Sequence, residues 1–187
     1  MTSSKAAASL GFIAPSSDPD AMLRRFRIMR RKLTPAIRRL ELDWTCATEI
    51  MRRLAEYLTD GITVALPGAR GALQPLLHVV LHRSLDAYQD AGREDDDVRL
   101  LVFAETAFSE AARLLAGQAV SDASSREWTA CRGVPLLPWL EAARGVDRVN
   151  VVPAQRTGDA GRIAAALAQY SLTDRDRNIL AGARNGR

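Results

Sequence analysis

The sequence contains few of the residues that support disulfide, metal or nucleophilic chemistry. It has two cysteines and two histidines in 187 residues. Cys46 and Cys131 lie far apart and form no C-x-x-C pair, which excludes a disulfide framework and fits a reducing, cytoplasmic setting. His78 and His82 share one predicted helix, with no serine or cysteine nucleophile spaced to meet them. We therefore expect no enzyme activity and no cofactor.

Long apolar runs are also absent from the sequence. No stretch approaches the roughly 18 consecutive apolar residues that a membrane span needs, so we predict no membrane-spanning segment. Residues 1–18 are rich in serine and alanine, and their apolar patch is too short for a secretory signal. We expect a disordered N-terminal tail there. Its composition also resembles that of type III secretion leaders, which leaves secretion by a leaderless route open.

The longest pattern in the chain is an apolar stripe over residues 22–58. Apolar residues recur there at steps of three and four, as one face of a helix requires. Thr34 and Pro35 interrupt the stripe, and no linker residues accompany them, so we predict one long helix with a kink at this point. Asp60 and Gly61 should end it. The front part of the stripe is our predicted helix interface: Met22, Phe26, Met29, Leu33, Ile37 and Leu40.

The front half of this helix also carries the charge asymmetry of the chain. The whole chain has a net charge of +4, whereas residues 21–40 alone sum to +8 because they contain no acid. Such a face suits an acidic protein partner, nucleic-acid phosphates or an anionic membrane surface. The predicted contact residues are Arg24, Arg25, Arg27, Arg30, Arg31, Lys32, Arg38 and Arg39.

A short row of possible metal ligands lies on a later helix. His78 and His82 are four residues apart and Asp86 continues the row, a spacing that can place two imidazoles and a carboxylate around one ion. The sequence lacks the glutamate that follows the first histidine in metallopeptidase helices, and it offers no further strong ligand. We therefore predict no metal site, and we expect histidines at the edge of an apolar face.

The remaining periodicity indicates a mainly α fold, a single helical domain over residues 19–187 with at most one small strand pair. Helical patterns cover 71–91 and 98–117, and a last helix begins at Thr173 as its cap. Residues 62–66 and 149–152 are strand candidates. Residues 118–133 lose periodicity and are predicted to form a surface loop.

A small α/β protein is the alternative fold, with residues 98–104 as a further strand. We prefer a continuous helix because its apolar arc stays in phase across that boundary.

These features favour a non-enzymatic bacterial protein that works through helix-mediated contacts, as an adaptor, a regulator or a secretion accessory. Its amphipathic basic helix would bind a protein partner or a second copy of the chain. The alternative is a transcriptional or plasmid regulator that binds nucleic acid through the Arg-rich face of residues 24–39.

Overall fold

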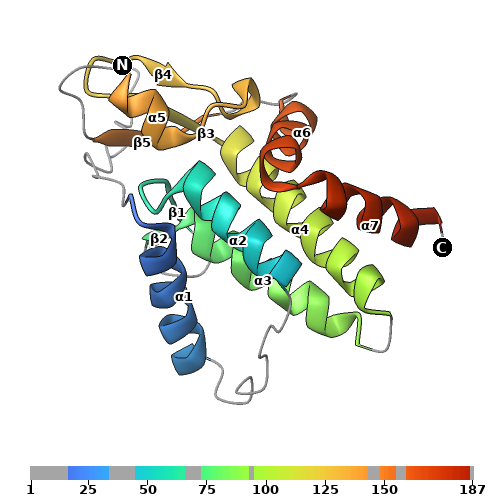
Figure 1. Ribbon diagram of the computed structural model, residues 1–187. Coiled ribbons are helices and arrows are strands. Elements are labelled where there is room, and N and C mark those ends of the chain that lie inside the picture. The colour runs from blue at the N-terminus through green and yellow to red at the C-terminus, as the bar shows by residue number, and fades with distance from the viewer. Residues whose placement is uncertain are drawn as a thin grey trace, which may run out of the picture.

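The computed structural model describes residues 17–33, 45–65, 73–92, 95–142, 148–154 and 159–185. This part of the chain is mostly helical and contains two small antiparallel sheets, which confirms the predicted mainly α class (Figure 1). Its helices are α1 (Pro19–Leu33), α2 (Thr45–Leu58), α3 (Leu76–Asp90), α4 (Asp96–Ala116), the 3-10 helix η2 (Ala130–Arg132), α5 (Leu136–Glu141), α6 (Ala160–Ser171) and α7 (Asp174–Asn185). Its strands are β1 (Thr63–Ala65), β2 (Leu73–Pro75), β3 (Gln118–Asp122), β4 (Glu127–Trp128) and β5 (Val149–Pro153).

Helix α4 is the centre of the helical layer. It packs against α2, α3, α6 and α7, and Figure 1 shows α3 and α7 on different sides of it. Its apolar arc is wide, and the large and small residues in it pack against these neighbours. Leu101, Phe103, Ala104 and Ala107 are all buried. The continuous helix predicted over 98–117 is confirmed, and the alternative strand at 98–104 is wrong.

The three-stranded sheet has the order β4-β3-β5 and covers one end of the helices (Figure 1). The predicted strand at 149–152 is present as β5, which pairs with β3. Residues 118–133 do not form the expected surface loop, because they contain β3, β4 and η2. Val120 and Trp128 lie opposite each other in the β3–β4 register and are both buried. Two buried side chains were too few to give a periodic signal in the sequence.

The second sheet is the antiparallel pair of β1 and β2. The predicted strand at 62–66 is confirmed by β1, whereas β2 takes residues that we expected to begin the next helix. That helix starts at Leu76, directly after Pro75. Proline has no N–H and so ends the strand ladder without leaving a donor unpaired.

Residues 22–58 do not form the expected kinked rod. Helix α1 ends at Leu33, and residues 34–44 lie outside the described part of the chain. Arg25 donates a hydrogen bond to the Asp60 carboxylate at 2.8 Å, although the two are 35 residues apart. A continuous helix would separate them by about 50 Å. Helix α1 therefore folds back against α2 instead of extending it.

The start of α1 follows the sequence closely. The Asp18 carboxylate accepts the Ala21 N–H at 3.0 Å and so satisfies one donor of the first helical turn. The predicted N-terminal tail falls largely on residues 1–16, which are outside the described residues. Within the described ranges, no helix is both long and apolar enough to cross a membrane.

Candidate functional site

The predicted basic face is described only in part. The side chains of Arg24 and Arg25 are exposed, at 69% and 56%, and each lies beside an acid. Arg24 is 3.6 Å from Asp18, and Arg25 is 2.8 Å from Asp60. The acids come from before α1 and after α2, so the acid-free stretch of sequence does not give these two arginines an acid-free surface. The other predicted contacts lie outside the described side chains: Arg27, Arg30, Arg31, Lys32, Arg38 and Arg39.

The apolar stripe of α1 faces the interior of the protein. Met22 and Phe26 are only 1% and 2% exposed, so in this structure they pack inside the protein, and their predicted role as a helix interface remains a prediction. The Phe26 ring contacts two rings of α3, those of His78 at 5.6 Å and His82 at 6.4 Å between centroids. The described part of the stripe is therefore covered by the protein's own helices. The remaining predicted interface residues fall outside the described side chains: Met29, Leu33, Ile37 and Leu40.

The histidine row of α3 splits into two environments. His78 is 9% exposed, and neither of its ring nitrogens has a hydrogen-bond partner among the described residues. Burial lowers the pKa of His78 below its ordinary value, the nearby Asp60 opposes this shift, and Arg25 adds to it. The His82 ring lies 3.3 Å from the Asp86 carboxylate. The described residues contain no cluster of three potential ligands that could hold a metal ion.

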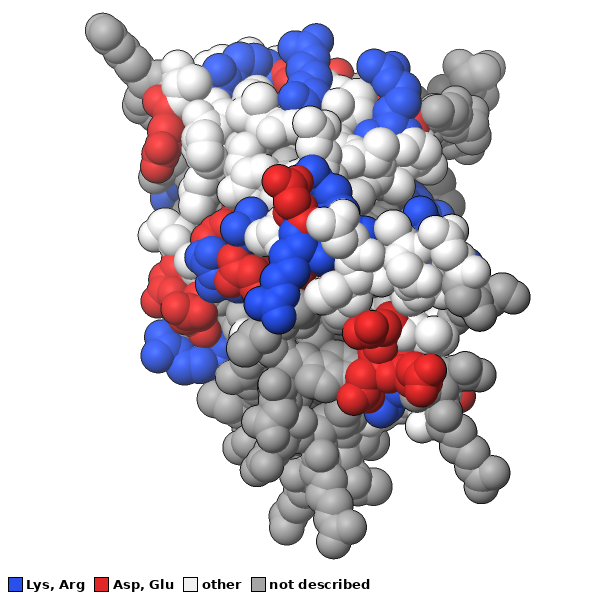
Figure 2. All heavy atoms as spheres, turned by 45° about the vertical axis from the view of Figure 1, so that its right-hand side comes forward, with Lys and Arg blue, Asp and Glu red and all other residues white. Residues whose placement is uncertain are grey.

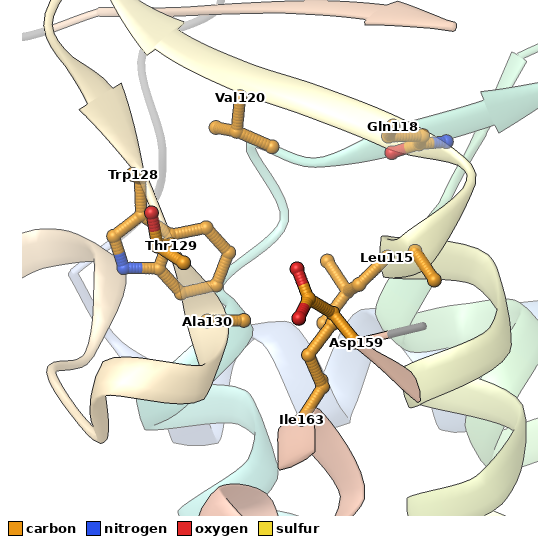
Figure 3. Close-up of a pocket in the computed structure, with 9 residues that line it drawn as sticks. Leu115, Gln118, Val120, Trp128, Thr129, Ala130, Asp159 and Ile163 are labelled. Carbon is orange, nitrogen blue, oxygen red and sulfur yellow. The ribbon is translucent and has the colours of Figure 1, made fainter. Parts of the chain in front are cut away.

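A small pocket lies between the three-stranded sheet and the helices (Figure 3). Figure 3 shows Leu115, Val120, Trp128 and Ile163 around a space that the Asp159 carboxylate also borders. Its volume of about 20 Å³ is room for roughly one water molecule, far below the ~300 Å³ of a typical ligand site. The Trp128 indole N–H already donates to a backbone carbonyl at 2.9 Å. The described pocket is therefore too small for a molecule much larger than water.

A larger groove, of about 210 Å³, lies between α4, α6 and α7. Its floor is apolar, and it exists because alanines occupy facing positions on all three helices. Ala104, Ala168 and Ala181 leave space where leucines would fill the gap between the helix axes. The full lining is Leu101, Ala104, Glu105, Phe108, Ala168, Leu172, Arg177, Leu180, Ala181 and Arg184.

Charged side chains mark the two ends of this groove. At one end Arg184 of α7 donates two hydrogen bonds to Glu105 of α4, at 2.7 and 3.0 Å. At the other end Arg177 donates to the backbone oxygens of Gln169 and Leu172, both at 3.0 Å, and so satisfies carbonyls at the end of α6. Arg177 and Arg184 are seven residues apart on α7, which makes the groove roughly 10 Å long.

Helix α7 is held in place by a capping arrangement that the sequence predicts. The Asp176 carboxylate accepts the Thr173 N–H at 2.8 Å and the Thr173 hydroxyl at 2.6 Å, and the Thr173 oxygen accepts the Asp176 N–H at 3.2 Å. This reciprocal pair fixes the direction in which α7 leaves α6.

The face of the molecule that Figure 2 presents is of mixed charge. Figure 2 shows acidic and basic side chains beside one another on the face that it presents, with uncharged surface above them.

No family model, curated protein or solved structure matches this chain. The groove between α4, α6 and α7 is the candidate site that its geometry supports best, and neither its alanines nor its end charges form a motif in the sequence.

Proposed function

We propose that the protein is a non-catalytic interaction protein that binds a short amphipathic helix of a protein partner in the groove between α4, α6 and α7. The observation that carries the proposal is the groove itself, an apolar space of about 210 Å³ with charged ends. Small-molecule sites usually measure about 300–1,000 Å³, so the groove is small for a metabolite. Its length of roughly 10 Å suits two side chains one helical turn, about 5.4 Å, apart.

The lining specifies the chemistry of the partner. Leu101, Phe108 and Leu180 form the floor of the groove with only 1%, 7% and 7% of their surface exposed, and the exposed Ala181 lies beside them, which favours apolar partner residues at a spacing of three or four. The Arg184 guanidinium has five N–H donors, and Glu105 accepts from its Nε and one Nη. A carboxylate on the partner can therefore bind the outer side of Arg184, which is 65% exposed.

The polar groups of the groove favour binding over catalysis. Glu105 and Arg184 satisfy each other in an exposed ion pair, and Arg177 is engaged with helix-end carbonyls. Catalytic acids and bases are expected in desolvated sites with a group left to exchange protons, and this arrangement offers none.

A displayed library of random twelve-residue peptides tests the proposal. We expect selection on the intact protein to enrich peptides with two large apolar residues three or four positions apart and a neighbouring acid. Ala181→Trp should weaken binding of the enriched peptides at least tenfold, because Ala181 lines the groove and the indole would occupy it. Ala165→Trp is the matched control, since Ala165 is also an exposed alanine but lies outside the groove lining.

Two results would overturn the proposal. One is a selection that enriches no common apolar pattern. The other is a set of peptides that bind the Ala181→Trp and Ala165→Trp proteins equally well. Retention of duplex DNA or RNA that weakens with salt, and that is unaffected by Ala181→Trp, would instead support the nucleic-acid hypothesis of residues 24–39.

A further inference from the structure

The buried face of α1 rests on a histidine that lacks hydrogen bonds. His78 of α3 is only 9% exposed, and its ring packs against the Phe26 ring of α1 with 5.6 Å between the ring centroids. Neither ring nitrogen has a partner among the described residues. Buried polar groups are paired in the great majority of cases, because leaving one unpaired destabilises the fold. An orphaned imidazole between two helices is therefore an unusual and consequential feature.

We propose that His78 is a proton-sensitive contact that releases α1 from α2 and α3 as the pH falls. A neutral imidazole is tolerated against Phe26, whereas an imidazolium there would be a buried charge whose N–H groups have no acceptor among the described residues. Release returns the ring to water, where its charge is solvated. Protonation of His78 therefore favours the released state of α1.

The charged groups around His78 do not replace that solvation. From α1, Arg25 faces it with a like charge, and Asp60, after α2, faces it with an opposite charge. The Asp60 carboxylate is already hydrogen-bonded to Arg25 at 2.8 Å, so much of its field is neutralised. On α3 itself, His82 lies edge-on to Phe26 and interacts with Asp86.

The sign and size of the effect follow from the titration of His78. Burial lowers the pKa of His78 while α1 is docked, and the released ring returns to its ordinary value of 6.5. The released state thus binds the proton more tightly, and docking weakens as the pH falls below 6.5. For a docked ring that stays neutral, the released-to-docked ratio rises about tenfold between pH 7.5 and pH 5.5.

Release would change what the surface of the protein offers. Met22, Leu23 and Phe26 are buried while α1 is docked, and release would expose them beside Arg24 and Arg25. The amphipathic basic face that the sequence suggests would then be available in a pH-dependent state. This inference is independent of the groove between α4, α6 and α7, and either proposal can fail without the other.

Hydrogen exchange of the full chain, measured by mass spectrometry at pH 7.5 and pH 5.5, tests the release. After correction for intrinsic exchange, we expect α1 amides over residues 22–26 to exchange up to about tenfold faster at pH 5.5, relative to amides of α4. The amides of α4 report global unfolding, so they separate local release from loss of the whole fold.

Variants of the two histidines complete the test. His78→Leu replaces the ring by an apolar side chain that cannot be protonated and should abolish the pH dependence of α1 exchange. His82→Gln, on the same helix, should keep it. If His78→Leu does not fold, His78→Gln serves the same purpose. Unchanged α1 exchange in the natural protein, or a pH dependence that survives loss of the His78 imidazole, would overturn the proposal.

Discussion

Phe26→Ala distinguishes a core role of α1 from an external one. Phe26 is 2% exposed and belongs to the same buried cluster as Met22 and Leu23. Removing a buried phenylalanine ring costs the transfer energy of its carbons and leaves a cavity, together about 3–5 kcal/mol. Because domains of ordinary size have about 5–15 kcal/mol of stability, this one change should remove a large share of it.

Urea unfolding followed by tryptophan fluorescence measures the loss. With a slope of about 1–3 kcal/mol per molar urea, the midpoint should fall by roughly 1–5 M. Arg24→Gln is the control on the same helix, since Arg24 is 69% exposed and its change should stay within about 0.5 kcal/mol. A loss below about 1 kcal/mol for Phe26→Ala, together with weaker self-association in light scattering, would refute the core assignment and restore an external interface.

Three further outcomes concern other parts of the fold. Asp176→Ala removes the carboxylate that accepts from Thr173, and should lower the free energy of unfolding by about 1–2 kcal/mol in urea or thermal denaturation. Burial raises the pKa of Tyr57 to about 12, so the absorbance of its phenolate should appear only near that pH. The contribution of Tyr57 to stability should be lost as the pH rises from 10 toward 12. Tyr57→Phe identifies which absorbance belongs to this residue. Hydrogen bonds from Arg126 and Ser124 outweigh burial and hold the pKa of Asp122 below its usual 3.8, so the stability from this residue should be lost as the pH falls below that value, and Asp122→Asn should remove that part of the acid dependence in denaturation curves.

Local sequence signals were sufficient to predict most helices. The apolar arc of α4 stays in phase over its whole length, and its first-turn acids Asp96 and Asp97 mark its start. Thr173 and Asp176 are three residues apart and cap α7 as their spacing predicts. Each of these signals is contained within a few turns of one helix, so the rest of the fold does not alter it.

The errors concern features that depend on tertiary contacts. Strand β3 is defined by its pairing with β4 and β5, and it has too few large apolar residues to give a strand pattern in the sequence. The charge of α1 was read from a window without acids, whereas Asp60 reaches Arg25 from 35 residues away. The sequence of a segment gives the charge of that segment, but the acids that lie beside it depend on the fold.

The contrast between α1 and α4 explains why the candidate site lies beside α4 and not on α1, where the sequence predicts it. An apolar stripe on a helix shows that the helix is covered, but it does not show by what. On α1 the stripe is narrow, and α3 contributes the rings that contact Phe26. On α4 the neighbouring helices leave only 1% of Leu101 and 7% of Phe108 exposed, and a groove of about 210 Å³ lies beside them where the alanines of α6 and α7 are small. A partner helix can bind apolar surface that the neighbouring helices do not pack against closely. The interaction hypothesis therefore concerns the side of the molecule where α4, α6 and α7 meet.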